Sequence, residues 1–134
     1  MNEKRFSMRS ALLLAVFPLI ALASCQSKPQ PSASHGPSPL DIMEKVAVGA
    51  NRCWIKSGDP AFKAYAMAPE LNSFSGKPRI LLVRKGSGDI RPLLVVQAEG
   101  RPARLDAFGP MMGEPVSSRI TSDVNRWARG GKDC

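Results

Sequence analysis

The 134-residue chain has few of the residues from which catalytic and metal sites are usually built. It contains one histidine and three cysteines, and only 6% of its residues are aromatic. The motifs HExxH and GxSxG are absent, and the acids are scattered, mostly beside basic residues, rather than placed as an acid/base pair. No group of metal-ligating residues with suitable spacing indicates a metal site. The sequence therefore predicts a protein that is not an enzyme and that holds no cofactor.

The chain also lacks an apolar run long enough to cross a membrane. The longest run, residues 11–23, has thirteen residues and contains Pro18, whereas a bilayer core about 30 Å thick needs roughly 20. Lys4, Arg5 and Arg9 precede this run, and small residues end it. A cationic start, a short apolar middle and a small-residue end are typical of a signal peptide.

The end of the apolar run carries a more specific pattern, Leu22-Ala23-Ser24-Cys25. It resembles the lipobox of bacterial lipoprotein precursors, in which a branched apolar residue and two small residues precede an obligatory cysteine. The resemblance covers about a fifth of the chain and implies cleavage before Cys25. It also implies a diacylglyceryl group on the Cys25 thiol and an acyl chain such as palmitate on its amine. The alternative is an ordinary signal peptide with an incidental cysteine.

The resemblance also implies where the protein resides. Two or three acyl chains on one residue suffice for stable attachment to a lipid bilayer. In the sorting rule best known for this family, aspartate after the cysteine retains a lipoprotein in the inner membrane, and here that residue is Gln26. We therefore expect the periplasmic face of the outer membrane, with the inner membrane as the alternative.

The mature chain is expected to begin with a tether. Residues 26–39 contain four prolines and four serines and no large apolar side chain, so they cannot build a core. We therefore divide the chain into a removed signal peptide (1–24), the lipidated Cys25 with its tether (25–39) and one globular domain (40–134). The mature chain has 16 basic and 10 acidic residues, a formal charge of +6.

The pattern of residues 40–134 predicts an α+β fold. Ser38 as N-cap, Pro39 and Asp41 begin a helix that runs to about Ile55. Its expected buried stripe consists of Leu40, Met43, Val46, Ala47, Ala50 and Trp54. A second helix is expected over residues 116–129, with a stripe of Val116, Ile120, Val124 and Trp127.

Between the helices, the pattern predicts an antiparallel meander of three to four strands. The expected strands cover residues 79–85, 91–99 and 103–108, with a weaker signal over 62–67. Residues 86–89 separate the first two runs as a hairpin turn. Because each run is apolar at consecutive positions, both sheet faces need cover. The face opposite the helices could be covered by the segment 62–67, by the loop 72–78 or by another protein.

Two cysteines remain if Cys25 is lipidated. Cys53 and Cys134 would lie in an oxidising compartment, and a disulfide between them is expected. Free or intermolecular thiols are the alternative. A redox pair is disfavoured because the spacing is not CxxC.

Two groups of residues are candidates for binding. Arg84, Lys85 and Arg91 lie on or beside the strands, where they could meet phosphates or carboxylates, or simply be solvated. Met111 and Met112 could contact a protein partner or fold back over the core. We expect an accessory or structural component of an envelope assembly. The alternative is direct binding of an anionic polymer or lipid, such as lipopolysaccharide or peptidoglycan. Export and the lack of an aromatic platform argue against nucleic acid.

Overall fold

The computed structural model describes residues 36–134. The expected signal peptide, Cys25 and residues 26–35 of the tether lie outside the described residues. The first helix, α1, spans Pro39–Ala50 and continues into a π-helical turn at Asn51–Ile55. The predicted start is confirmed, because the Asp41 backbone N–H donates to Ser38 Oγ and the Ser38 N–H donates to the Asp41 carboxylate.

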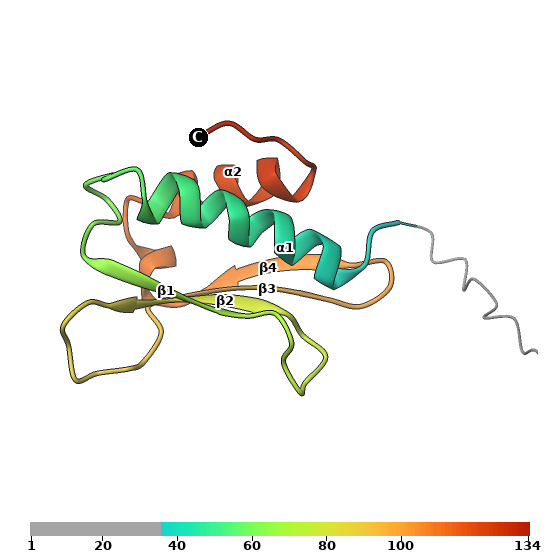
Figure 1. Cartoon of the computed structure of the whole chain (residues 1–134), viewed down its shortest axis with the longest axis horizontal. Helices are drawn as coiled ribbons and strands as arrows, with labels where there is room; N and C mark the ends of the chain where they lie inside the picture. The colour runs from blue at the N-terminus through green and yellow to red at the C-terminus, as the bar shows by residue number, and fades with distance from the viewer. Residues whose placement is uncertain (1–35) are drawn as a thin grey trace, which may run out of the picture. The chain divides into compact units, whose positions relative to one another are not determined.

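The remaining elements confirm the predicted α+β class. Four antiparallel strands form one sheet in the order β1-β2-β3-β4, a simple meander (Figure 1). A short 3₁₀ helix and a second α-helix follow the sheet. The elements after the π turn are β1 (Tyr65–Glu70), β2 (Arg79–Arg84), β3 (Leu94–Glu99), β4 (Arg104–Phe108), η2 (Pro110–Gly113) and α2 (Ser117–Ala128).

Two strand boundaries differ from the sequence-based prediction. β1 begins at Tyr65 rather than Phe62, because Phe62 lies in a turn and stacks on Trp54 with ring centroids 4.7 Å apart. β3 begins at Leu94 rather than Arg91, because Pro92 has no N–H to donate to a ladder. The β2–β3 connection is therefore longer than the four-residue turn that was expected.

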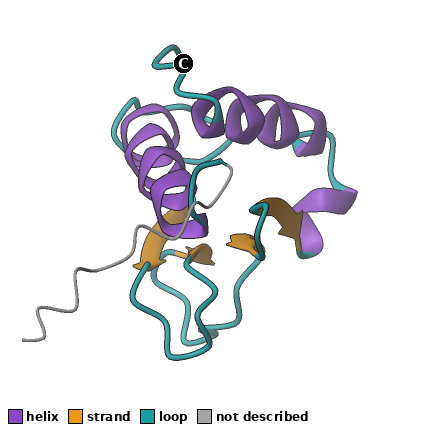
Figure 2. Cartoon of the chain, turned by 90° about the vertical axis from the view of Figure 1, so that its right-hand side faces the viewer, coloured by secondary structure: helices purple, strands orange, loops and turns teal. Residues whose placement is uncertain are grey.

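Both helices lie on the same side of the sheet (Figures 1 and 2). α1 contacts β2 and β3, and α2 packs against α1 and η2. The buried core lies between them and includes most of the predicted helix stripes. Its largest fully buried side chains are Trp54, Trp127, Phe62, Met43, Ile80, Leu82, Leu94, Met111, Ile120, Val46, Val96 and Val124.

One predicted member of the first stripe lies at the surface. Leu40 is 38% exposed, and Ile42 is buried in addition to Met43 and Val46. In the part of the chain that the structure describes, no helix combines the length and apolar character that crossing a membrane requires.

Candidate binding surfaces

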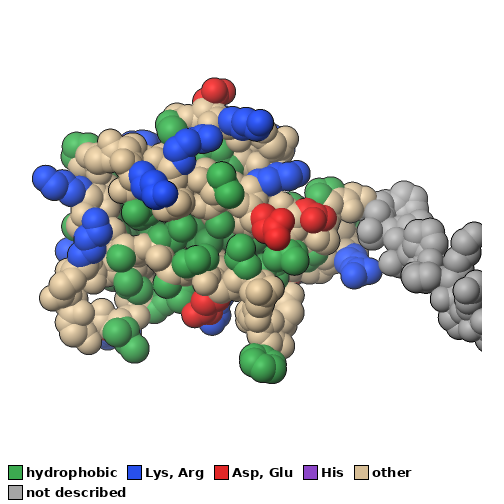
Figure 3. Space-filling model, viewed as in Figure 1, with side chains coloured by type: hydrophobic (Ala, Val, Ile, Leu, Met, Phe, Trp, Pro, Cys, Tyr) green, Lys and Arg blue, Asp and Glu red, His purple; other side chains and the backbone are tan. Residues whose placement is uncertain are grey.

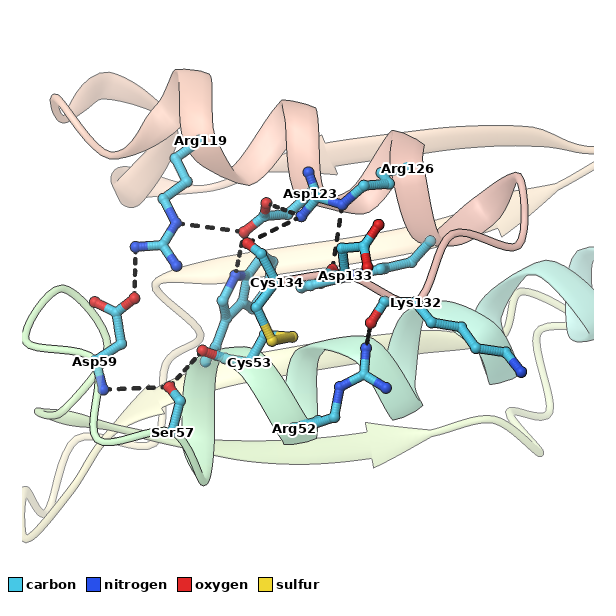
Figure 4. The surroundings of a disulfide bond; sticks show 12 residues. Arg52, Cys53, Ser57, Asp59, Arg119, Asp123, Arg126, Lys132, Asp133 and Cys134 are labelled. Atoms are coloured by element: carbon cyan, nitrogen blue, oxygen red, sulfur yellow. Dashed lines mark hydrogen bonds and ion pairs between the residues drawn. A yellow bond between two sulfur atoms is a disulfide. The ribbon is translucent and has the colours of Figure 1, made fainter.

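A disulfide confirms the predicted pairing of Cys53 with Cys134 (Figure 4). Their Cα atoms are 5.3 Å apart, and 81 positions separate them along the chain. The segment after α2 is held by further bonds to its backbone. The Trp127 indole N–H donates to the carbonyl of Asp133 at 2.9 Å, and the Arg52 guanidinium donates to the carbonyl of Lys132. The bridge thus belongs to a structural clamp.

A buried carboxylate stabilises the same region. The side chain of Asp123 in α2 is 4% exposed and accepts a hydrogen bond of 2.9 Å from Nε1 of Trp54. Its two flanking arginines form ion pairs with it, Arg126 at 2.5 Å and Arg119 at 3.4 Å. Arg119 also reaches Asp59 at 2.5 Å (Figure 4). Every polar atom of this carboxylate therefore has a partner, which indicates a structural role and not a reactive group.

The three basic candidates from the sequence do not gather into one site. Arg91 forms an ion pair with Asp89 at 2.7 Å and holds the pKa of that exposed carboxyl at about 2. The guanidinium of Arg84 lies over the Tyr65 ring, 5.6 Å from its centroid. The Lys85 ammonium donates to a backbone carbonyl of the loop before β1 at 3.2 Å. Each cation already has a contact within the chain.

Other bases on or beside the strands also form ion pairs with neighbouring acids. Arg79 pairs with Glu70 at 2.6 Å, and Lys77 pairs with Glu99 at 2.5 Å. The Lys77 contact lowers the pKa of Glu99. Arg104 approaches the second oxygen of Glu99 at 3.9 Å. Four bases on or beside the strands are therefore paired with acids, whereas Arg84 and Lys85 are not.

The methionine loop folds inward. Met111 is fully buried in the core, and Met112 is half-buried and packs against it. The sequence left two interpretations open, and the structure supports the one in which the two methionines fold back over the core. Met111 therefore offers no surface to a partner, which corrects its selection as a binding candidate.

The sheet face opposite the helices carries an apolar row. Strand register places Ala68, Leu81, Val95 and Phe108 side by side across all four strands. Their outward direction follows because Ile80 and Leu82, which alternate with Leu81, are buried under the helices. Leu81 is half-buried, and Phe108 is 45% exposed. We call this surface, completed by Ala66 and Val83, the open face.

The segment 62–67, one of the two covering segments proposed from the sequence, does not cover the open face. The segment 62–67 contributes β1 to the sheet itself, and Phe62 packs on the helix side. Leu81, Val83 and Phe108 neither belong to the buried core nor pack against it. Of the apolar row, Leu81 and Phe108 therefore remain at least partly exposed, whereas Val95 is only 8% exposed.

Two loops project on the side of the open face (Figures 1 and 2). The β1–β2 loop carries Phe74, which is fully exposed, and the β2–β3 loop carries Ile90, which is 85% exposed. Figure 3 shows apolar side chains at the ends of both loops. Exposed large apolar residues placed around an apolar face are typical of an interaction surface.

A second surface was missed by the sequence reasoning. A groove of about 320 Å³ lies between α1 and the segment after α2. Its lining includes Lys45 and Arg52 of the first helical segment together with Lys132. Lys132 lies 80 positions after Arg52 and further still from Lys45. No sequence motif could reveal them, because the clamp at Cys134 brings them together.

The described residues show no metal centre. Within residues 36–134, no three histidine, cysteine, aspartate or glutamate side chains are grouped so that they could hold a metal ion. Comparisons with protein-family models, with curated proteins and with solved structures found no match.

Proposed function

We propose that this protein is a lipid-anchored binding module of the bacterial envelope. In this proposal, Cys25 carries the anchor, residues 26–39 form a tether, and the folded domain is an accessory or structural component of an envelope assembly. The open face supports it most directly. This face presents an apolar row that the helices leave uncovered, with Phe74 and Ile90 exposed on the loops beside it.

A protein partner suits this surface better than an anionic polymer does. Polymer binding would need cations free to meet phosphates or carboxylates, but Lys77, Arg79 and Arg91 already pair with acids of the chain. An apolar centre surrounded by polar groups is the usual anatomy of a protein interface. Direct binding of lipopolysaccharide or peptidoglycan remains the alternative.

The anchor is tested by Cys25→Ser, which removes the thiol that would be acylated. Cells are fed a fatty-acid probe, and the protein is recovered and examined for label. We expect label on the unchanged chain and none on the variant, which should also stay uncleaved before residue 25. Cys53→Ser is the matched control and should still be labelled. Label on the Cys25→Ser protein would contradict the anchor.

Docking on the open face is tested by crosslinking in living cells. A photoreactive amino acid is placed at Phe108 of the open face or, as a control, at Leu40, whose exposure is similar but which lies on α1. We expect a discrete protein adduct from position 108 only. The same adduct should disappear when Phe74→Asp and Ile90→Asp are combined.

Salt distinguishes this function from its alternative. Screening shortens the range of electrostatic attraction from about 10 Å at 0.1 M to about 3 Å at 1 M. A complex formed through apolar contacts should survive 1 M salt and the paired reversal Arg84→Glu with Arg91→Glu. Loss of all binding at moderate salt, or through that reversal alone, would favour the anionic polymer.

A further inference from the structure

The groove between α1 and the segment after α2 carries an excess of positive charge. Three cations line it, Lys45, Arg52 and Lys132, and one acid, Glu44. Among residues 36–134, none of these four side chains forms an ion pair, whereas Lys77, Arg79, Arg91 and Arg104 each pair with an acid. An excess of unpaired positive charge around a concave surface attracts anions.

The interior of the groove is mainly apolar. Val48, which is 65% exposed, lies on its wall, and Trp127 contributes to its floor. Gly49 lies directly on the indole of Trp127, where a Cβ atom would collide with the ring. Gly130 and Gly131 complete the opposite side without side chains. Glycines therefore line the groove on both of its sides.

The positive charge and the apolar interior of the groove together define the chemistry of a ligand. A bare inorganic anion would gain only what exposed, screened charges provide, which is little. A purely apolar molecule would gain nothing from the positive charges of Lys45, Arg52 and Lys132. We propose that the groove binds a small amphipathic anion, an apolar ring or chain that carries a phosphate or carboxylate group. The volume, about 320 Å³, is at the small end of the range of ligand sites, roughly 300–1,000 Å³.

Arg52 gives the site a fixed element. Its guanidinium donates to the backbone carbonyl of Lys132, on the opposite side of the groove (Figure 4). This bond uses one of the five N–H donors of the guanidinium, so others remain for an anionic group. The disulfide between Cys53, the next residue, and Cys134 holds both sides of the groove together. The site is independent of the open face, since it lies on the helix side of the molecule.

The two tryptophans of the chain provide a direct readout. Trp127 lines the groove, whereas Trp54 donates to buried Asp123 and does not line it. The whole chain is labelled with 5-fluorotryptophan and placed in phosphatidylcholine nanodiscs, and its two ¹⁹F resonances are assigned with Trp54→Phe. We expect 1-naphthyl phosphate to shift the Trp127 resonance in a saturable manner and to leave that of Trp54 in place. Inorganic phosphate at the same concentration should shift neither.

Charge variants establish where the probe binds. Lys45→Gln combined with Lys132→Gln should weaken binding by about tenfold, the effect of losing two partly exposed ion pairs. Lys63→Gln combined with Arg101→Gln removes the same charge elsewhere and should leave the affinity unchanged. Val48→Glu should abolish the shift by placing a carboxylate in the groove.

The titrations and the variants can either overturn or support anion binding in the groove. An equal shift with inorganic phosphate, equal affinity in the two double variants, or an unchanged response of Val48→Glu would overturn the proposal. Nanodiscs that contain phosphatidylglycerol separate the two sources of such an anion. A Trp127 shift in these discs without added probe identifies a lipid headgroup, and its absence beside a positive probe titration identifies a soluble anion. Both of these results support the site, and neither depends on the crosslinks from Phe108.

Discussion

The indole Nε1 of Trp54 donates a hydrogen bond of 2.9 Å to Oδ2 of Asp123, and both side chains are buried. This contact joins the π turn after α1 to the middle of α2 across 69 positions of the chain. Trp54 also packs on Trp127, with ring centroids 5.1 Å apart. The pair therefore fixes how the two helices meet.

Replacing the buried acid tests the importance of this contact. Asp123→Ala should lower the free energy of unfolding by about 1–3 kcal/mol, because it leaves the Trp54 N–H buried without an acceptor. Arg119 and Arg126 would also lose an ion-pair partner, but both reach solvent and can be hydrated. Denaturant unfolding of the whole chain, followed by tryptophan fluorescence, measures the change.

Asp123→Asn serves as the companion variant, because an amide oxygen can still accept from the indole. It should cost less than the alanine variant. Asp106→Asn, at an exposed position of β4, should change stability by less than about 0.5 kcal/mol. Equal stability of Asp123→Ala and the unchanged protein would show that the hydrogen bond contributes nothing.

The disulfide should contribute more than any single hydrogen bond. Bridging residues 81 positions apart restricts the unfolded chain, and removing a native disulfide from a small exported domain costs about 2–5 kcal/mol. Cys53→Ala should therefore lower the unfolding midpoint strongly. Cys25→Ser leaves the bridge intact and is the control. Mass spectrometry after alkylation without reductant should find Cys53 and Cys134 unmodified, and rapid alkylation of both would contradict the bridge.

Local patterns explain why much of the fold could be predicted. The capping residues Ser38 and Asp41, the apolar spacing along both helices and the order of the strands are properties of neighbouring residues. The disulfide followed from counting cysteines once Cys25 was assigned to lipid. Each of these inferences needed little knowledge of which distant segments meet.

The binding surfaces depend on distant segments and were predicted poorly. The sequence suggested a basic surface at Arg84, Lys85 and Arg91, but strand register and local turns give each cation a partner. No local sequence pattern indicated that Asp123 is buried and bonded, because its partner Trp54 lies 69 positions away. The groove at Lys45 and Lys132 exists only after the segment beyond α2 returns to α1.

Lowering the pH should weaken the ion pair between Asp59 and Arg119 of α2. The backbone N–H of Ala61, at 2.9 Å, and then Arg119 hold the pKa of Asp59 below its usual value of 3.8. A carboxyl with a lowered pKa stabilises the fold at pH values above its unfolded pKa, and this stabilisation is lost as the pH falls through the folded pKa. Unfolding midpoints measured from pH 6 down to pH 2 should therefore fall.

Asp59→Asn isolates the part of this decline that Asp59 causes. The variant should be less stable than the unchanged protein at pH 6, and the difference should shrink below about pH 4. Asp106→Asn is again the control. A stability difference that stayed constant over the whole range would assign the decline to other carboxyls.

Gly49 provides a test in which helix propensity and packing predict opposite signs. Alanine is favoured over glycine by about 1 kcal/mol inside a helix, so Gly49→Ala would stabilise α1 if propensity decided. The added Cβ atom would instead collide with the buried ring of Trp127, and overpacking of this kind costs about 1–3 kcal/mol. We expect net destabilisation, together with a displaced Trp127 resonance.

Gly88→Ala is the control, since its Cβ would meet open space. A stabilised Gly49→Ala protein would mean that α1 and α2 can separate at this point without cost, and that the floor of the groove is not rigid.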